Sequence, residues 1–155
     1  MKEFPWRVVL AKNLERNQQL IRKIKSILKA SGTEGKGAPE SFPWKPLQTA
    51  ESLESVLQDG HDRPLVLYKH STSCGFSSMM LRRFQQLWDP SRELADFYLL
   101  DLLRYRDLSN SISVQFQVRH QSPQVIIIKD NRVVAHASHS GIDELRPEDL
   151  IKTPD

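Results

Sequence analysis

The sequence contains a single cysteine, Cys74, among its 155 residues. One thiol cannot form an internal disulfide, and a structural zinc site needs about four nitrogen or sulfur ligands, so neither is expected to stabilise the fold. If Cys74 takes part in redox chemistry, the partner sulfur must come from another molecule. The alternative is a buried cysteine that packs as a small apolar side chain, which is the commoner role of a lone cysteine.

Long hydrophobic runs are also missing. No apolar run approaches the roughly 20 residues that a membrane-spanning helix requires. The first residues lack the continuous apolar segment and the small-residue cleavage site of a secretory signal, so we expect a cytoplasmic protein. Apolar residues make up 39% and charged residues 26%, which indicates a folded domain rather than a disordered chain.

The excess positive charge is confined to the first part of the chain. Residues 1–40 contain nine Lys and Arg against four Asp and Glu, whereas residues 41–155 contain thirteen against fifteen. Nucleic-acid-binding domains usually carry a basic stripe on the fold itself. The mildly acidic remainder therefore argues against a nucleic-acid partner.

Residues 1–30 are predicted to form a basic, amphipathic helical arm. The apolar residues that line one face at spacings of three, four or seven are Trp6, Leu10, Leu14, Ile21, Ile24 and Leu28. Such a face can pack on its own domain or on the same helix of a second subunit; less commonly it binds a membrane surface or another partner. Residues 31–46 are rich in Gly, Pro and Ser and are predicted to be a linker, with one domain at 47–155.

The domain is predicted to alternate helices and strands. The expected elements are a helix at 49–57, a strand at 65–68, a helix ending near Trp88, a strand at 97–100, a helix at 106–116, a hairpin of strands at 125–128 and 133–137 around Asp130-Asn131, and a last helix at 142–151 capped by Ser140. This is the element order of a thioredoxin-type α/β fold. It predicts a central mixed sheet of about four strands flanked by helices, with an N-terminal helical extension.

Cys74 is predicted to lie between a buried strand and the first turn of a helix. The free N–H groups and positive dipole end of a helix stabilise a thiolate there. Ser73 and Ser77 add hydroxyl groups, and Gly75 permits close approach of a partner. Ser77 occupies the position where a dithiol motif has its second cysteine. A substrate attacked by Cys74 would therefore stay attached until an external thiol released it.

Ser122-Pro123 comes directly before an apolar strand. Most X-Pro bonds are trans, and a proline at the first position of a strand has a simple structural explanation, because its missing N–H costs little there. A cis bond here would instead direct the backbone of Ser122 toward Cys74 and offer it to an extended substrate.

Several motifs in the correct order resemble a known family over about residues 47–145. They are Lys69-His70-Ser71-Thr72-x-Cys74, Phe97-Tyr98-x-Leu100-Asp101, Ser109-Asn110, Val118-x-His120-x-Ser122-Pro123-Gln124-Val125, and His136-Ala137-Ser138-His139-Ser140-x-Ile142. They are similar to the bacillithiol-system proteins of the YtxJ type, which are monothiol bacilliredoxins with a thioredoxin-like fold.

This resemblance implies a monothiol thiol–disulfide oxidoreductase that removes bacillithiol from S-bacillithiolated proteins. Cys74 would attack the mixed disulfide, and Ser122-Pro123 would be a cis-proline loop facing it. Bacillithiol would be a co-substrate, with no tightly bound cofactor, and the partners would be thiolated client proteins.

One residue departs from the family pattern, because Gly75 follows the cysteine where the family commonly has proline. Cys74-Gly75-Phe76-Ser77 is the signature of monothiol glutaredoxins, which carry a [2Fe–2S] cluster. Against that alternative, Lys69 lies only five residues before the cysteine, and the glycine pair expected after the hairpin is missing. A third possibility is a non-catalytic interaction module with an inert Cys74.

Four histidines are candidates to come near the Cys74 end of the sheet: His70, His120, His136 and His139. One of them could protonate a leaving thiol, and the motif resemblance favours His139. Each has the ordinary alternative of a surface or hydrogen-bonded imidazole. His136 and His139 are not spaced as a metal pair on a strand, so no metal site is predicted.

Overall fold

The computed structural model describes residues 15–16, 18–26, 42–58, 63–90 and 93–152, and the chain divides into two compact units, 1–38 and 39–155. In the first unit residues 15–16 and 18–26 are helical, and Ile24 is buried, in agreement with the predicted N-terminal helix. The other predicted apolar positions of that helix, and most of the predicted linker, lie outside the described residues.

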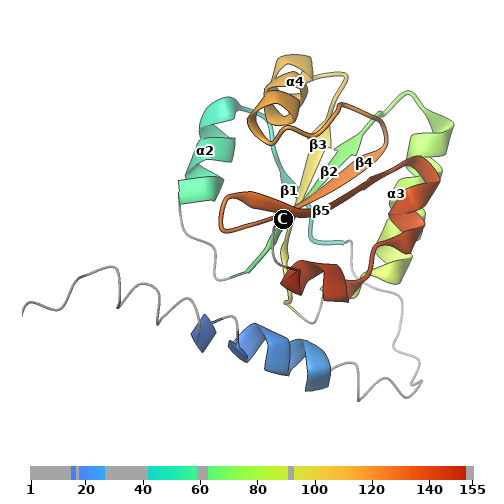
Figure 1. Ribbon diagram of the computed structural model, residues 1–155. Helices are drawn as coiled ribbons and strands as arrows, with labels where there is room; N and C mark the ends of the chain where they lie inside the picture. Colours follow the sequence, from blue (N-terminus) through green and yellow to red (C-terminus); the bar gives the residue numbers. More distant parts are fainter. Residues whose placement is uncertain (1–14, 17, 27–41, 59–62, 91–92, 153–155) are drawn as a thin grey trace, which may run out of the picture. The chain divides into compact units, whose positions relative to one another are not determined.

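The second unit is built on a five-stranded mixed sheet with the strand order β1-β3-β2-β4-β5 (Figure 1). Strands β2 (Leu65–His70) and β3 (Asp96–Asp101) are parallel, and β4 (Gln124–Lys129) runs antiparallel to both β2 and β5 (Arg132–Ser138). All six residues of β2 are buried, as expected for a central strand covered on both faces.

The prediction of about four strands missed β1, which consists only of Lys45–Pro46 and pairs in parallel with β3. Two residues carry no periodicity, and Pro46 cannot donate a ladder hydrogen bond, so only the pairing with Tyr98 and Leu99 reveals this edge strand. β1 lies at the end of the stretch that the sequence indicated as a linker.

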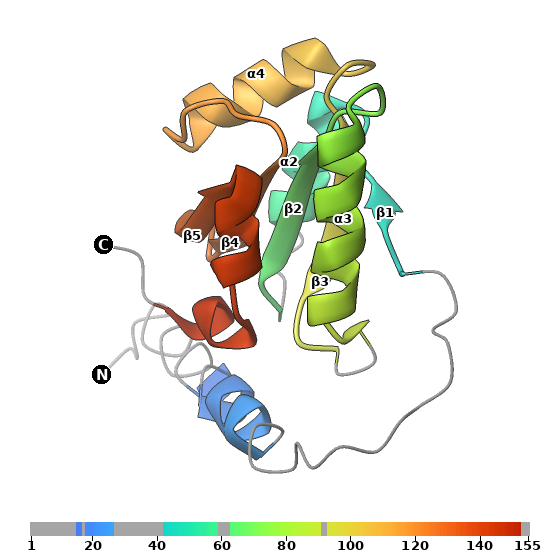
Figure 2. The ribbon, with the colours of Figure 1, turned by 90° about the vertical axis from the view of Figure 1, so that its right-hand side faces the viewer.

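Three α-helices cover the sheet: α2 (Ala50–Gln58) and α4 (Arg106–Gln115) lie on one face, and α3 (Gly75–Leu87) lies on the other (Figures 1 and 2). Under α2 and α4 the core is mainly aliphatic, and it includes Leu53, Leu67, Leu100, Ile112 and Ile126. Under α3 it is aromatic, with rings in contact from Phe42, Trp44, Tyr68, Phe84, Trp88 and Phe97.

The predicted hairpin is confirmed. Asp130 and Asn131 connect β4 to β5 with φ values of 51° and 60°. Two successive residues with positive φ form the kind of two-residue turn that matches the twist of paired strands, and Asp and Asn tolerate that conformation better than most residues.

The prediction of one final helix at 142–151 is wrong. The structure has two short 3₁₀ helices instead, η2 (His139–Glu144) and η3 (Pro147–Ile151), and Ser140 lies inside η2 rather than capping a longer helix. Pro147 restricts the preceding residue to extended backbone, and Arg146 accordingly has φ −131° and ψ 158°. Ile142, Leu145 and Leu150 are nevertheless buried, so both turns contribute to the core.

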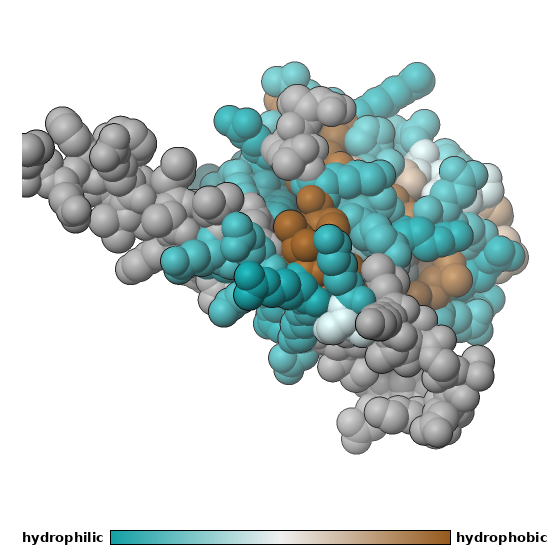
Figure 3. Space-filling model, turned by 60° about the horizontal axis from the view of Figure 1, so that its bottom comes forward, coloured by the Kyte–Doolittle hydropathy of each residue, from teal (hydrophilic) through white to brown (hydrophobic). Residues whose placement is uncertain are grey.

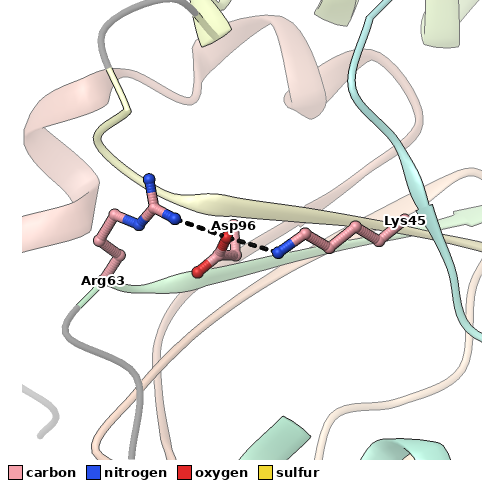
Figure 4. Close-up of polar contacts among 3 residues, drawn as sticks. All are labelled: Lys45, Arg63 and Asp96. Atoms are coloured by element: carbon pink, nitrogen blue, oxygen red, sulfur yellow. Dashed lines mark hydrogen bonds and ion pairs between the residues drawn. The ribbon is translucent and has the colours of Figure 1, made fainter.

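An ion-pair cluster joins the sheet at the end opposite Cys74 (Figure 4). The carboxylate of Asp96, at the start of β3, accepts hydrogen bonds from Lys45 of β1 at 2.9 Å and from Arg63, just before β2, at 3.1 Å. One buried acid thereby connects the segments of three neighbouring parallel strands.

The described surface is mostly hydrophilic on the face shown in Figure 3, with hydrophobic residues exposed only in small patches. Scattered apolar exposure of this kind is normal for a folded domain. Among the described helices, none has the length and apolar character needed to cross a bilayer.

Candidate active site

Cys74 lies at the amino-terminal end of α3, where the parallel strands β2 and β3 also end. Its backbone is extended, with φ −106° and ψ 115°, and it occupies the N-cap position of the helix. Its N–H donates to the Ser71 carbonyl at 3.2 Å, and its own carbonyl accepts the N–H of Ser78 at 3.0 Å. The free thiol is partly exposed and its side chain makes no capping hydrogen bond with the helix. A partly exposed sulfur at the start of a helix can be reached by a reaction partner from outside the protein.

The residues beside Cys74 leave the sulfur open to approach. Ser73 and Gly75 are both exposed, and a Cβ atom added at Gly75 would meet no atom within 4 Å. Phe76 is also exposed for an aromatic residue, at 42%. The turn therefore leaves open space beside Gly75 for a second molecule.

Ser77 lies in the interior rather than at the surface. It is fully buried, and its Oγ accepts the N–H of Ser71 at 3.1 Å and lies 2.8 Å from Nδ1 of His70. His70 is the last residue of β2 and is itself buried. Burial lowers the pKa of His70 below its usual range, and the negative charge of Asp101 opposes that shift. The imidazole is therefore neutral at neutral pH.

Asp101 connects the turn before Cys74 to the loop after β3. One carboxylate oxygen accepts the N–H groups of Leu103 and Arg104, at 3.0 Å and 3.4 Å. The other accepts the hydroxyl of Thr72, two residues before the cysteine, at 3.4 Å. These hydrogen bonds connect the segments that follow the carboxyl-terminal ends of β2 and β3.

Lys69 projects to the opposite face of the sheet from His70, as strand alternation predicts. It is fully buried, and its Nζ donates to the Ser109 carbonyl at 2.8 Å and to the Ser113 hydroxyl at 3.0 Å, both in α4. Burial lowers the pKa of Lys69 to about 8. Lys69 therefore anchors α4 beneath the site instead of facing Cys74.

The Ser122-Pro123 peptide bond is cis. The last pair of the antiparallel β2–β4 ladder is Lys69 with Gln124. If the same register is continued, Pro123 lies opposite His70 and Ser122 lies opposite Ser71. Pro123 is buried and Ser122 is partly exposed. The general frequency of X-Pro bonds predicts a trans bond here, which is wrong. The family resemblance implies the cis bond that is found.

His139 joins the cis-proline loop to the helix of Cys74. Its N–H donates to the Pro123 carbonyl at 3.0 Å, and its ring lies 6.4 Å from that of Phe76, measured between centroids. Its φ of 54° is a left-handed conformation that few non-glycine residues adopt, and such residues are often found at functional sites. The side chain is exposed, as a residue that meets a substrate must be.

The other two histidines lie elsewhere. His120 is hydrogen-bonded through Nδ1 to the Ser109 hydroxyl at 3.2 Å, on the α4 side of the sheet. His136 pairs with Ile126 in the interior of the β4–β5 ladder, away from the strand ends where Cys74 lies. In the described part of the chain, no three His, Cys, Asp or Glu side chains gather closely enough to hold a metal ion.

The sequence reasoning favoured His139 and did not anticipate the contact between His70 and Ser77. Two features of the sequence nevertheless predict this contact. Strand alternation turns His70 to the face opposite Lys69, which is the face that α3 covers, and Ser77 is in the first turn of that helix. The spacing of seven residues across a tight turn brings the two side chains together.

Solved structures with the same architecture include one described as "A putative oxidoreductase with a thioredoxin fold". It is 25% identical, with 68% of this chain and 88% of that chain covered and a TM-score of 0.56. Thioredoxin from Trypanosoma brucei brucei is 14% identical, with 75% and 95% covered and a TM-score of 0.57. Fasciola hepatica thioredoxin is 20% identical, with 70% and 99% covered and a TM-score of 0.57. These likenesses establish a thioredoxin-like fold.

The family comparison is more specific. The model of the family described as "Monothiol bacilliredoxin BrxC" matches residues 45–146, a range that begins at β1 and ends just before η3. It includes Cys74, the cis-proline loop and His139. Family and fold together support a thiol–disulfide oxidoreductase. The chain belongs to the monothiol bacilliredoxin family.

Proposed function

We propose that this protein removes bacillithiol from S-bacillithiolated proteins through a mixed disulfide on Cys74. The observation that carries the proposal is a partly exposed thiol at the amino-terminal end of α3 with Ser77, not a second cysteine, in the first helical turn. Cys74 is the only cysteine of the chain, so no internal thiol can resolve a disulfide formed on it.

The first step is attack of the Cys74 thiolate on the bacillithiol sulfur of the client's mixed disulfide. A bond forms between Cys74 and bacillithiol, the original S–S bond breaks, and the client thiolate leaves with the electron pair and takes up a proton from solvent or a nearby acid. His139 is our candidate for that acid, because it is exposed and bonded to the cis-proline loop.

In the second step a free bacillithiol thiolate attacks the sulfur of bacillithiol bound to Cys74. Bacillithiol disulfide is released, and Cys74 returns as a thiolate, so the electrons balance without a bound cofactor. Bacillithiol is thus a co-substrate. Ser73 and Gly75 adjoin Cys74 in the chain, and the sheet register brings Ser122 and Pro123 to the same end of the sheet, where we propose the client backbone lies.

We further propose that the protein works in the cytoplasm, where thiols are kept reduced, and that its clients are thiolated proteins and not nucleic acids. The N-terminal helix is proposed to mediate self-association or, as a second option, contact with a membrane surface. Deletion of residues 1–40, followed by measurement of mass in solution and of vesicle binding, distinguishes these roles.

The direct test is incubation with bacillithiol disulfide followed by intact mass measurement. We expect one bacillithiol adduct per chain, lost in Cys74→Ser and retained in His136→Asn, whose imidazole lies on β5 away from the strand ends. A bacillithiolated client should then be restored by the wild-type protein and not by Cys74→Ser. The absence of any adduct on the wild-type chain would reject the proposal.

The iron–sulfur alternative is tested separately, because Cys74-Gly75-Phe76-Ser77 is also the tetrad of cluster-carrying glutaredoxins. Anaerobic reconstitution with iron, sulfide and either bacillithiol or glutathione should leave a colourless protein if the proposed function is correct. A coloured dimer that depends on Cys74 would favour cluster transfer instead.

A further inference from the structure

The cis-proline loop, residues 117–123, connects α4 to β4 and is held by side chains that belong to the sheet. Nε2 of Gln124 donates to the carbonyl of Arg119 at 2.9 Å and so closes a ring around the residues between them. From the neighbouring strand, the Ser138 hydroxyl donates to Oε1 of Gln121. Both bonds act on the residues that directly precede the proline dipeptide.

The sheet register explains why Gln124 can reach the loop. Gln124 is the first residue of β4, and it pairs with Lys69 of β2 on one side and with Ser138 of β5 on the other. Residues paired directly across a ladder point to the same face of the sheet. Lys69 donates to α4, so all three side chains lie on the face that α4 covers. The loop descends from α4 on that face, which places its backbone within reach of Gln124.

Stability alone does not explain a glutamine at this buried position. Gln124 is only 1% exposed, and its Oε1 is buried without a hydrogen-bond partner among the residues that the structure describes. A buried polar atom without a partner costs free energy, and an apolar side chain of similar size would avoid that cost. The bond from Nε2 to the loop is the contact that an apolar side chain could not make.

Ser122 is the residue of this loop that is left open to a partner. It is partly exposed, and no hydrogen bond joins it to another residue in the described part of the chain. The residues on either side of it are held, Gln121 by Ser138 and Pro123 by the N–H of His139. The fastened neighbours therefore determine where the backbone groups of Ser122 point.

We propose that Gln124 is a positioning residue for client binding, because its bond to Arg119 holds Ser122 in place before a client arrives. The role in client binding rests on the proposed function, whereas the effect of the bond on the loop does not. Without the bond, the loop must be ordered when the client binds, and fixing the backbone of one residue weakens binding by about tenfold. Gln124 lies on the face that α4 covers, whereas Cys74 begins α3 on the other face, so the reactivity of the sulfur should not change.

The test compares Gln124→Met with the wild-type protein. Methionine has a similar size, removes the Nε2 donor together with the unpaired Oε1, and leaves the carbonyl of exposed Arg119 to water, so the variant should fold. The substrate is a short extended peptide with one bacillithiolated cysteine, at a fixed concentration of free bacillithiol. We expect kcat/KM for the peptide to fall about tenfold and kcat to stay unchanged, because the second step does not involve the peptide. The rate at which iodoacetamide alkylates Cys74 should also stay unchanged.

Two further variants separate positioning from stability. Ile128→Val is the matched control, because Ile128 is buried on the same face at the opposite end of β4; it should lower the melting temperature and leave kcat/KM for the peptide unchanged. Ser138→Ala removes the second bond to the loop at a partly exposed position, and it should lower kcat/KM in the same direction as Gln124→Met. If Ile128→Val lowers kcat/KM as much as Gln124→Met does, Gln124 acts only through stability and the proposal is wrong.

Amide hydrogen exchange gives a second readout that does not use bacillithiol. Gln124→Met should exchange faster than the wild type at residues 119–122 and at the same rate in β2 and α3; equal exchange at 119–122 would overturn the inference. If the loop loosens but the wild-type protein does not turn over the peptide, only the proposed function is removed. If both proteins turn over the peptide with the same kcat/KM, only this inference is removed.

Discussion

Replacing Lys69 with methionine should make the protein more stable at neutral pH, although it removes two hydrogen bonds. Lys69 is fully buried against α4, and its pKa falls from 10.5 to about 8 because burial penalises the charged form. No carboxylate accepts a hydrogen bond from its ammonium group among the contacts that the structure describes; its acceptors are a carbonyl and a hydroxyl. A buried cation of this kind is costly to keep charged.

The magnitude follows from the difference in proton binding between the folded and unfolded chains. Between the folded value of about 8 and the unfolded value of 10.5, the unfolded chain keeps the proton that the native protein has lost, so the free energy of unfolding rises with pH. From pH 7 to 9.5 this amounts to about 2 kcal/mol, at about 1.4 kcal/mol per pH unit. The penalty at pH 7 is roughly 3 kcal/mol.

The partners left behind by Lys69→Met remain satisfied, because the Ser113 hydroxyl also donates to the Ser109 carbonyl at 3.2 Å. We therefore expect a gain of about 1–3 kcal/mol at pH 7, after allowing for the two lost hydrogen bonds. Urea unfolding followed by circular dichroism at pH 7, 8, 9 and 9.5 measures both effects, with exposed Lys25→Met as the control. The reasoning is refuted if the variant shows the same rise with pH as the wild type, or if it is much less stable at pH 7.

Three further outcomes are expected from the packing. Asp96→Asn should lower the free energy of unfolding by about 1 kcal/mol, because the carboxylate is buried while Lys45 and Arg63 are substantially exposed; salt should weaken the difference. Phe84→Ala should lower it by about 3–5 kcal/mol, since the ring is fully buried at the centre of the aromatic cluster, and urea unfolding monitored by tryptophan fluorescence will measure this loss. Gln117→Gly should raise the melting temperature, because residue 117 follows α4 with a φ of 53° that glycine adopts at less cost; an unchanged or lower value would contradict this.

Short-range features account for the parts of the fold that could be predicted. Apolar runs identified the four longer strands, and Asp130-Asn131 marked the hairpin, because turn residues and strand periodicity act over a few neighbouring positions. The predicted helix at 142–151, in which Pro147 was expected to make the inner turns irregular, is instead divided there, because the proline restricts Arg146 to extended backbone. Strand β1 could not be predicted for a non-local reason, because its two residues are recognised as a strand only by their pairing with β3.

By itself, the sequence determined that one thiol lies between a buried strand and a helix start, that no second thiol can resolve it, and that the chain follows a thioredoxin-type order. Only the tertiary structure decided which side chains meet there. It brings the cis Ser122-Pro123 peptide and His139 to that end of the sheet, buries Lys69 under α4 and joins His70 to Ser77. These contacts depend on register and on the face that each strand residue takes, which are fixed when the sheet and its helices pack together.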